Sequence, residues 1–288
     1  MMRASRKKIV SLMFAVLISW GCQEIIDIDI PQTDPKLVIE GRLINELSVQ
    51  KIKISESLNY YDTTDLKPLD DATVSLLDAN SVLIEDFTYN PEDSFYLSNN
   101  PIELLEGNDY KVQIEVNGEL LEASGSILEN ATLDSLYYFS AEELENLGQA
   151  AFGDGYFLFA DGRLNNEGVE YFKLDVTIND TLQNSRGDFS NSVLSTELFG
   201  KQFQSLPIPG AFEEEDSVML ELYTLNEDMY QYYVEFINLL FNDGGVFSPP
   251  PVNPTTNIKN LSNPENQPLG FIQFSAVQRK SIVIEKRE

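Results

Sequence analysis

Residues 110–116 alternate strictly between apolar and polar side chains, and this pattern constrains the fold more than any other feature of the chain. Successive side chains of a β-strand point to opposite faces, so the alternation predicts a strand with one buried face. Asn117 and Gly118 follow at once, and both tolerate the positive φ that a two-residue hairpin turn requires. We therefore expect residues 120–126 to return antiparallel. The expected buried positions are Tyr110, Val112, Ile114 and Val116.

The same alternation recurs through the first half of the chain. Residues 49–55 place Ile52 and Ile54 on one face, with lysines on the other. Short strands joined by turns, without a helical stretch, are typical of a β-sandwich. We predict that the chain is mainly β and that residues 36–128 form an immunoglobulin-like or transthyretin-like β-sandwich. Further strands are expected at residues 37–44, 72–77 and 82–87.

Residues 129–288 are expected to form a second, β-rich domain, with the joint at residues 129–132. Pro207, Pro209 and the acidic run Glu213–Asp216 indicate a surface loop within residues 181–216, which show no clear period. Residues 141–149 favour a short helix. The expected strands of this domain are 136–139, 156–160, 172–178, 218–224, 269–277 and 280–286.

One amphipathic helix interrupts the second domain, near residues 227–241. Asn226 can cap it, and Glu227 and Asp228 complement the positive end of its dipole. We interpret its apolar stripe as the face that packs on the protein's own sheet, and the docking of a partner is the alternative. The stripe consists of Met229, Tyr233, Phe236, Ile237, Leu240 and Phe241.

The N-terminus carries a basic start followed by the apolar run Ile9–Trp20, which is far shorter than the roughly 20 helical residues that cross a bilayer. Gly21 and Cys22 come next, where a bacterial lipoprotein precursor would be cut. We predict a lipoprotein signal peptide at residues 1–21 and attachment of lipid, palmitate included, at Cys22. An ordinary signal peptide beside a chance cysteine is the alternative.

Residues 22–35 are expected to be an acidic tether between that anchor and the first strand. Gln23 follows Cys22, so the aspartate linked to retention in the inner membrane is absent. We therefore expect a lipid anchor in the outer membrane. The lipid of that membrane is the first partner that we expect. The sequence leaves open whether the protein faces the periplasm or the cell surface.

Composition excludes several classes of chemistry. The chain has no histidine and one cysteine, so His-based triads, His metal sites and disulfides are ruled out. The net charge of −28 argues against nucleic acid as a partner. An enzyme would have to depend on carboxylates, Lys, Ser or Tyr. We expect no catalytic residues, no cofactor and no metal site.

A few residue groups are candidates for binding. Asp154-Gly155 and Asp161-Gly162 could hold calcium in loops, although Asp-Gly pairs are ordinary turn residues. The aromatic clusters 137–139 and 232–233 could line a groove, and packing in the core is the alternative. The basic C-terminal cluster, which could simply protect an edge strand, consists of Arg279, Lys280, Lys286 and Arg287.

Several short segments, in this order and spacing, resemble an uncharacterised lipoprotein family of Bacteroidota, the domain-of-unknown-function 4249 family. The resemblance covers essentially all of the chain after Cys22. It implies an outer-membrane lipoprotein commonly encoded beside a TonB-dependent transporter, and no binding residues can be carried over. The segments are Leu37–Gly41, Asp71–Val74, Gly107–Tyr110, Leu133–Leu136, Phe247–Pro249, Asn257-Ile258 and Leu269–Ile272.

The function that we expect is that of a non-enzymatic accessory lipoprotein, which captures or caps the ligand of a TonB-dependent transporter. The ligand itself is unknown. A carboxylate-based polysaccharide hydrolase is one alternative, and it would need two carboxylates facing a cleft. A surface adhesin or structural protein is another.

Overall fold

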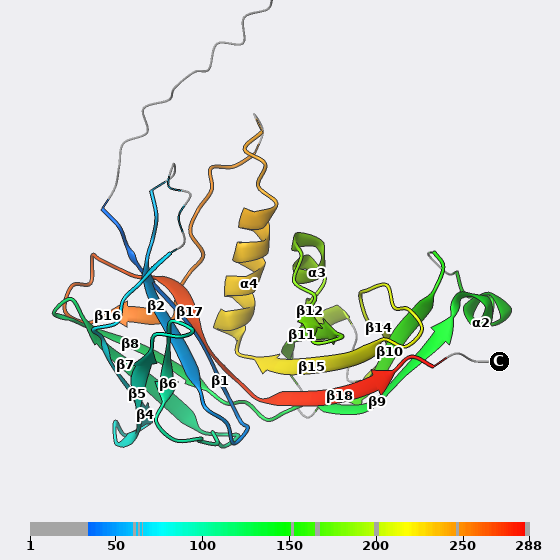
Figure 1. Ribbon diagram of the computed structural model, residues 1–288, viewed down its shortest axis with the longest axis horizontal. Helices are drawn as coiled ribbons and strands as arrows, with labels where there is room; N and C mark the ends of the chain where they lie inside the picture. Colours follow the sequence, from blue (N-terminus) through cyan, green and yellow to red (C-terminus); the bar gives the residue numbers. More distant parts are fainter. Residues whose placement is uncertain are drawn as a thin grey trace, which may run out of the picture. The chain divides into compact units, whose positions relative to one another are not determined.

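The computed structural model describes residues 34–59, 62, 64, 66–150, 153–164, 168–198, 202–245 and 248–285 (Figure 1). The prediction of a mainly β fold is confirmed. The described residues from Pro35 onward, apart from Asn59 and Asp62, form one compact unit. The predicted leader, Cys22, nearly all of the tether, and Phe247, Lys286 and Arg287 lie outside the described residues.

The first sheet is built from the alternating strands of the first half of the chain. Its core positions include Ile52 and Ile54, which are inward as expected. β7 and β8 form the predicted hairpin, with Asn117 and Gly118 at φ 53° and 75°. The strands are β1 (Leu37–Ile44), β2 (Lys51–Glu56), β3 (Lys67–Pro68), β4 (Thr73–Asp78), β5 (Leu83–Asn90), β6 (Phe95–Ser98), β7 (Asp109–Val116) and β8 (Glu119–Ser126).

Two strands from the C-terminal part complete this sheet, β16 (Ile258–Asn260) and β17 (Leu269–Ser275). The strand order is β16-β8-β7-β4-β5-β6-β2-β1-β17, with β3 beside β2, and β17 also lies near β8 and β16. The sheet is therefore nearly closed, like a barrel. Residues 258–275, which the sequence analysis placed with the second domain, thus belong to the first sheet. Ile258, Ile272 and Phe274 are buried in its core.

β17 runs parallel to β1, in register from Val38 opposite Leu269 to Ile44 opposite Ser275. Gly270 makes this approach possible because its φ is +91° and a Cβ there would lie 2.1 Å from the carbonyl oxygen of Ile39. Any other residue would be strained and would push the two strands apart.

The second half of the chain forms two smaller sheets. β9 (Thr132–Ser140), β10 (Tyr156–Arg163) and β14 (Gln202–Pro207) make one, in the order β14-β10-β9. β12 (Thr181–Leu182), β11 (Tyr171–Ile178), β15 (Ser217–Leu225) and β18 (Val277–Val283) make the other, with β13 (Val193–Ser195) also paired to β11.

The loop expected at residues 181–216 is only partly right. This segment contains β12, β13 and β14, the helix α3 (Arg186–Ser190) and the 3-10 turn η1 (Thr196–Leu198). Ser185 and Asp188 form a capping box that starts α3, and short elements of this kind leave no long hydrophobic period in the sequence. The acidic run Glu213–Asp216 does lie in a turn.

Chain connectivity joins the two halves directly. Only Ala276 separates β17 from β18, so one run of chain passes from the first sheet to the third (Figure 1). A cluster of buried side chains from the first sheet, the third sheet and α4 packs around this passage. Its members are Tyr223, Leu225, Met229, Tyr233, Phe271 and Val277.

The predicted helices are present as α2 (Ala141–Asn146) and α4 (Glu227–Leu240). α4 packs on the protein's own strands through Met229 and Tyr233, whereas Phe241, just after its last turn, is 48% exposed. Asn226 occupies the N-cap position, but its side chain makes no capping bond. Its Nδ2 donates instead to the carbonyl oxygens of Ser126 and Phe274, at 2.9 and 3.1 Å, which ties the helix start to β8 and β17.

Among the described residues, no helix has the length and apolarity needed to cross a membrane.

Candidate functional site

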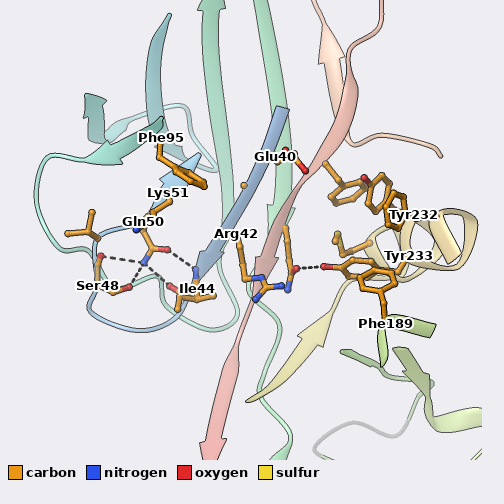
Figure 2. A pocket seen from close by; sticks show the side chains of 16 residues that line it. Glu40, Arg42, Ile44, Ser48, Gln50, Lys51, Phe95, Phe189, Tyr232 and Tyr233 are labelled. Carbon is orange, nitrogen blue, oxygen red and sulfur yellow. Dashed lines mark hydrogen bonds between the residues drawn. The ribbon is translucent and has the colours of Figure 1, made fainter. Parts of the chain in front are cut away.

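A cleft of about 520 Å³ lies between the outer face of the first sheet and helix α4 (Figure 2). Strands β1, β2 and β17 form its floor, α4 forms one wall, and Phe189 of α3 and Phe95 of β6 close the sides. Its lining residues are Glu40, Gly41, Arg42, Ile44, Ser48, Val49, Gln50, Lys51, Phe95, Phe189, Met229, Tyr232, Tyr233, Phe236, Phe271 and Gln273.

The floor follows from strand alternation and register. Glu40 and Arg42 are two residues apart on β1, so they share the face of the sheet that points away from the barrel core. The parallel register places Phe271 beside Glu40, and Gln273 beside Arg42. On the other side of β1, the antiparallel register places Lys51 beside Arg42. An acidic and a basic position therefore stand next to one another along the cleft.

Aromatic rings from α4 make the facing wall. Tyr232 lies 5.1 Å from Phe271 and is stacked on Phe236 at 6.1 Å, measured between ring centroids. Phe189 packs edge-on against Phe236 at 5.5 Å. Burial, followed by the charge of Glu40, raises the pKa of Tyr232 to about 12, so this hydroxyl stays neutral.

Tyr233 anchors the helix to the floor. Its hydroxyl donates to Gln273 Oε1 at 2.8 Å, and Gln273 Nε2 donates to Ser275 Oγ at 2.8 Å. Burial raises the pKa of Tyr233 well above its ordinary value. Both polar side chains of this pair are therefore engaged within the protein, and their role is to fix the wall.

Gln50 shapes the loop at the other end of the cleft. Its Oε1 accepts from the Ile44 backbone N–H at 3.0 Å, and its Nε2 donates to Ser48 Oγ at 3.1 Å and to the Ile102 carbonyl at 3.2 Å. Gln50 is buried and hydrogen-bonded on both sides of its amide. It ties the end of β1 to the segments around Ser48 and Ile102.

A charge cluster joins the floor residue Arg42 to two buried residues of β11. Arg42 Nη1 donates to Asp175 Oδ2 at 2.9 Å, and Lys173 Nζ pairs with the other oxygen of Asp175. Lys173 and Asp175 lie on β11 and are each 5% exposed. The ammonium of Lys173 also lies 5.3 Å from the ring centroid of Phe189. We call these three residues the junction triad, because Arg42 comes from the first sheet and the other two from the third.

The triad's charges respond differently to burial. Burial lowers the pKa of Lys173, and this outweighs the attraction of Asp175. For Asp175, burial alone would raise the pKa, but Lys173 and Arg42 together lower it below 3.8. Burial alone would lower the pKa of Arg42, but the neighbouring oxygens, among them the ionised and hydrogen-bonded Asp175, raise it. Two cations thus share one ionised carboxylate.

Lys173 and Asp175 alternate with apolar residues along β11, a pattern that is typical of a strand with one exposed face. The middle of β11 is nevertheless buried on both faces. The reason is tertiary: Phe172, Leu174 and Val176 face one core, while Arg42 and the rings of Phe189 and Tyr233 cover the opposite face.

The basic cluster near the C-terminus is tied into the same region. Arg279 Nε donates to Glu221 Oε1 at 2.6 Å, and its guanidinium also pairs with Glu46 of the first half. Lys280 Nζ donates to the carbonyl oxygen of Asp134 at 2.6 Å. Both described members lie on β18, at the edge of the third sheet's strand order, and are already engaged in contacts within the protein.

The Asp-Gly pairs do not form a pair of calcium loops, because Asp161 and Gly162 lie within β10, at a bulge in its pairing with β9. The Asp161 carboxylate accepts from the backbone N–H of Ser205 at 2.7 Å, from Ser135 Oγ and from the Tyr137 hydroxyl. These donors, the first above all, lower its pKa. Among the described residues no group of three potential ligands has metal-binding geometry.

The two aromatic clusters have different environments. Tyr232 and Tyr233 line the cleft, as one of the two interpretations expected. Tyr138 is buried, and its hydroxyl donates to the Glu285 carbonyl at 3.2 Å, whereas Tyr137 and Phe139 pack with Phe159 on the small sheet.

Sequence reasoning missed most of the cleft. Glu40, Arg42, Lys51, Phe95 and Phe271 are spread over residues 40–271 and have no motif in common. The available signal was the run of charged residues on the outer face of predicted strands 37–44 and 49–55, opposite their apolar face.

Comparison with known families matched the chain to the family described as Domain of unknown function (DUF4249), over residues 23–281. Comparison with curated proteins gave no match.

Proposed function

The chain belongs to the DUF4249 family, and from its cleft we propose that it is a non-enzymatic ligand-binding lipoprotein of the outer membrane. In this role it serves as the accessory of a TonB-dependent transporter, the partner that the family resemblance implies. The observation that carries the binding role is the cleft of about 520 Å³ between β1 and α4. Mostly apolar clefts with a few placed polar groups are the usual form of small-molecule sites.

The chemistry of the lining favours binding over hydrolysis. Among the described lining residues Glu40 is the only carboxylate, and a glycosidase needs two across its cleft. A second depression contains two, Asp134 and Asp161. The pKa of each is lowered, that of Asp134 chiefly by hydrogen bonds from Arg163. A general acid needs the opposite shift.

Lipid attachment at Cys22 would strengthen binding to a transporter even where the direct contacts between the two proteins are weak. A single acyl chain holds a protein to a membrane only marginally, and additional chains make the attachment stable. Two proteins confined to one membrane meet at a raised effective concentration, so a modest interface between them is sufficient.

The proposal is tested by cross-linking in native outer membranes, followed by purification through a C-terminal tag. We expect the wild-type protein and the control variant Gln23→Ala to be lipid-modified at Cys22 and to recover a TonB-dependent barrel. Cys22→Ala should lose the modification and most of the recovered barrel. Recovery of the wild-type protein unmodified, or of modified protein without any barrel, would contradict the proposal.

A further inference from the structure

We propose that the cleft binds short peptides with free ends, placing the ammonium group at Glu40 and the carboxylate between Arg42 and Lys51. Apolar side chains of the peptide lie against the aromatic rings of the two walls. The inference rests on the ligand-binding part of the proposed function and specifies its ligand class. It requires neither the lipid anchor nor the transporter.

The spacing of the charges is the first argument. Glu40 and Arg42 are alternate residues on one face of β1, so their Cα atoms are about 6.8 Å apart along the strand. Each residue of an extended peptide spans about 3.3–3.6 Å, so the end charges of a dipeptide or tripeptide are about 6–10 Å apart. A zwitterion of this length can therefore reach both positions at once.

The acidic end of the cleft suits an ammonium group. Glu40 is exposed and lies in register with Phe271, whose ring is 5.1 Å from Tyr232. Phe236 stacks on Tyr232 and extends the same aromatic wall. A carboxylate beside aromatic faces attracts an organic cation through charge and through the negative faces of the rings. The cation nearest in register is Lys53, which lies opposite Glu40 on β2. Its ammonium lies over Phe95, 5.9 Å from the ring centroid.

The basic end suits a carboxylate. Arg42 uses Nη1 for Asp175 and its guanidinium lies 4.3 Å from the ring centroid of Tyr223, and the side chain, which is 36% exposed, lines the cleft. Because Lys173 shares the same Asp175, the junction triad has one more cation than carboxylate. Lys51, beside Arg42 across β1 and β2, is 54% exposed and forms an exposed ion pair with Asp93, with 3.6 Å between Nζ and Oδ2. Guanidinium N–H groups bind carboxylates in a directed, charge-assisted geometry.

The remaining surface suits apolar side chains. Phe95 and Phe189 face the cleft from opposite sides, and the polar groups of Gln50, Gln273 and Tyr233 are engaged within the protein. A ligand rich in hydroxyl groups would find few free partners among them. An apolar peptide needs partners only at its two ends, which is where the cleft has its charges.

The test is calorimetric titration of the mature protein, in lipid nanodiscs, with trileucine. Three further probes are N-acetyl-trileucine, trileucine amide and cellotetraose. Loss of a hydrogen-bonded charge pair weakens binding by about tenfold or more, so each blocked peptide should bind about tenfold more weakly than trileucine. Cellotetraose should not compete.

Variants assign the two ends of the peptide. Glu40→Gln should bind trileucine and its N-acetyl form within about twofold of each other, while still preferring a free carboxylate, because only the ammonium site is neutralised. Lys51→Gln should reduce the preference for the free carboxylate. Glu115→Gln, at an exposed position of β7 outside the cleft, should match the wild type.

Three results would overturn the inference. They are no trileucine binding at concentrations of about 5 mM, equal affinity for free and blocked peptides, and binding of cellotetraose alone. The last result would leave a binding role with a glycan as the ligand. The partnership with a transporter is tested separately, by the cross-linking experiment in native membranes, and its outcome does not depend on these titrations.

Discussion

Substitution of Asp175 by asparagine should lower the free energy of unfolding more than any single substitution on the protein's surface. The carboxylate is 5% exposed and pairs with Arg42 of the first sheet and Lys173 of the third. Asparagine keeps the size of the side chain and removes its negative charge. The buried ammonium of Lys173 and the partly exposed guanidinium of Arg42 would then face one another without compensation.

The magnitude follows from burial. Removal of one partner from a buried ion pair typically costs about 3–5 kcal/mol, because the charge left behind is neither solvated nor paired. For a protein of this size each kcal/mol lowers Tm by about 2–4 °C. We expect Asp175→Asn to lose about 3–5 kcal/mol of unfolding free energy and about 6–20 °C in Tm.

Urea unfolding followed by far-ultraviolet circular dichroism measures the change, and Lys173→Met is the matched control. Methionine has a similar length and no charge, so this variant leaves Arg42 and Asp175 as a balanced pair. It also removes an ammonium whose pKa is already lowered by burial. Its unfolding free energy should therefore lie within about 1 kcal/mol of the wild type, or above it.

The reasoning is refuted if Asp175→Asn costs less than about 1 kcal/mol, the range of an exposed pair. It is equally refuted if Lys173→Met costs as much as Asp175→Asn, since the carboxylate would then have no special role between the two cations.

The remaining predictions concern other contacts. Gly270→Ala combines left-handed strain with a clash against the Ile39 carbonyl, so it should cost about 2–4 kcal/mol in urea unfolding; a cost below about 1 kcal/mol would contradict the close pairing of β1 and β17. Asn226→Asp should cost about 1–2 kcal/mol although aspartate caps helices well, because it loses the Nδ2 bonds to Ser126 and Phe274; unchanged stability would mean that capping is the role of this residue. The pKa of Asp175 is lower in the folded protein than its ordinary value of 3.8, so its ionised form stabilises the fold above that pH, and this stability is lost as pH falls through the folded-state pKa. The urea midpoint of the wild type should therefore fall more steeply below about pH 4 than that of Asp175→Asn. Parallel pH curves for the two proteins would contradict this. Protein purified from its host should show tyrosine emission alone, because Trp20 lies in the predicted leader, and tryptophan emission would indicate an uncleaved leader.

Local patterns predicted the local elements well. The alternation at residues 110–116 and the Asn117-Gly118 turn gave β7, the hairpin and β8, since strand faces and turn angles depend on neighbouring residues. The stripe on residues 229–240 gave α4 for the same reason. The sequence placed Asn226 correctly at the N-cap of α4, but the expected capping bond is absent. Its side chain donates instead to Ser126 and Phe274, on strands that are remote in sequence.

The cleft could not be found in this way. Phe271 reaches it only because β17 pairs with β1 across more than 200 residues of chain, and no local period encodes the partner of a strand. Tyr232 could be placed on a helix from sequence, but the position of that helix over the first sheet depends on the strands that it packs against, β11, β13 and β17.

By itself the sequence determined the strand and helix content, the facing of Ile52 and Ile54, and the absence of histidine and disulfide chemistry, because these depend on composition and near neighbours. Only the tertiary structure decided that Lys173 and Asp175 are buried and that Glu40 and Arg42 face a cleft. A polar side chain on a strand is exposed or buried according to what packs over it, and here the covering atoms come from elements far away in the chain.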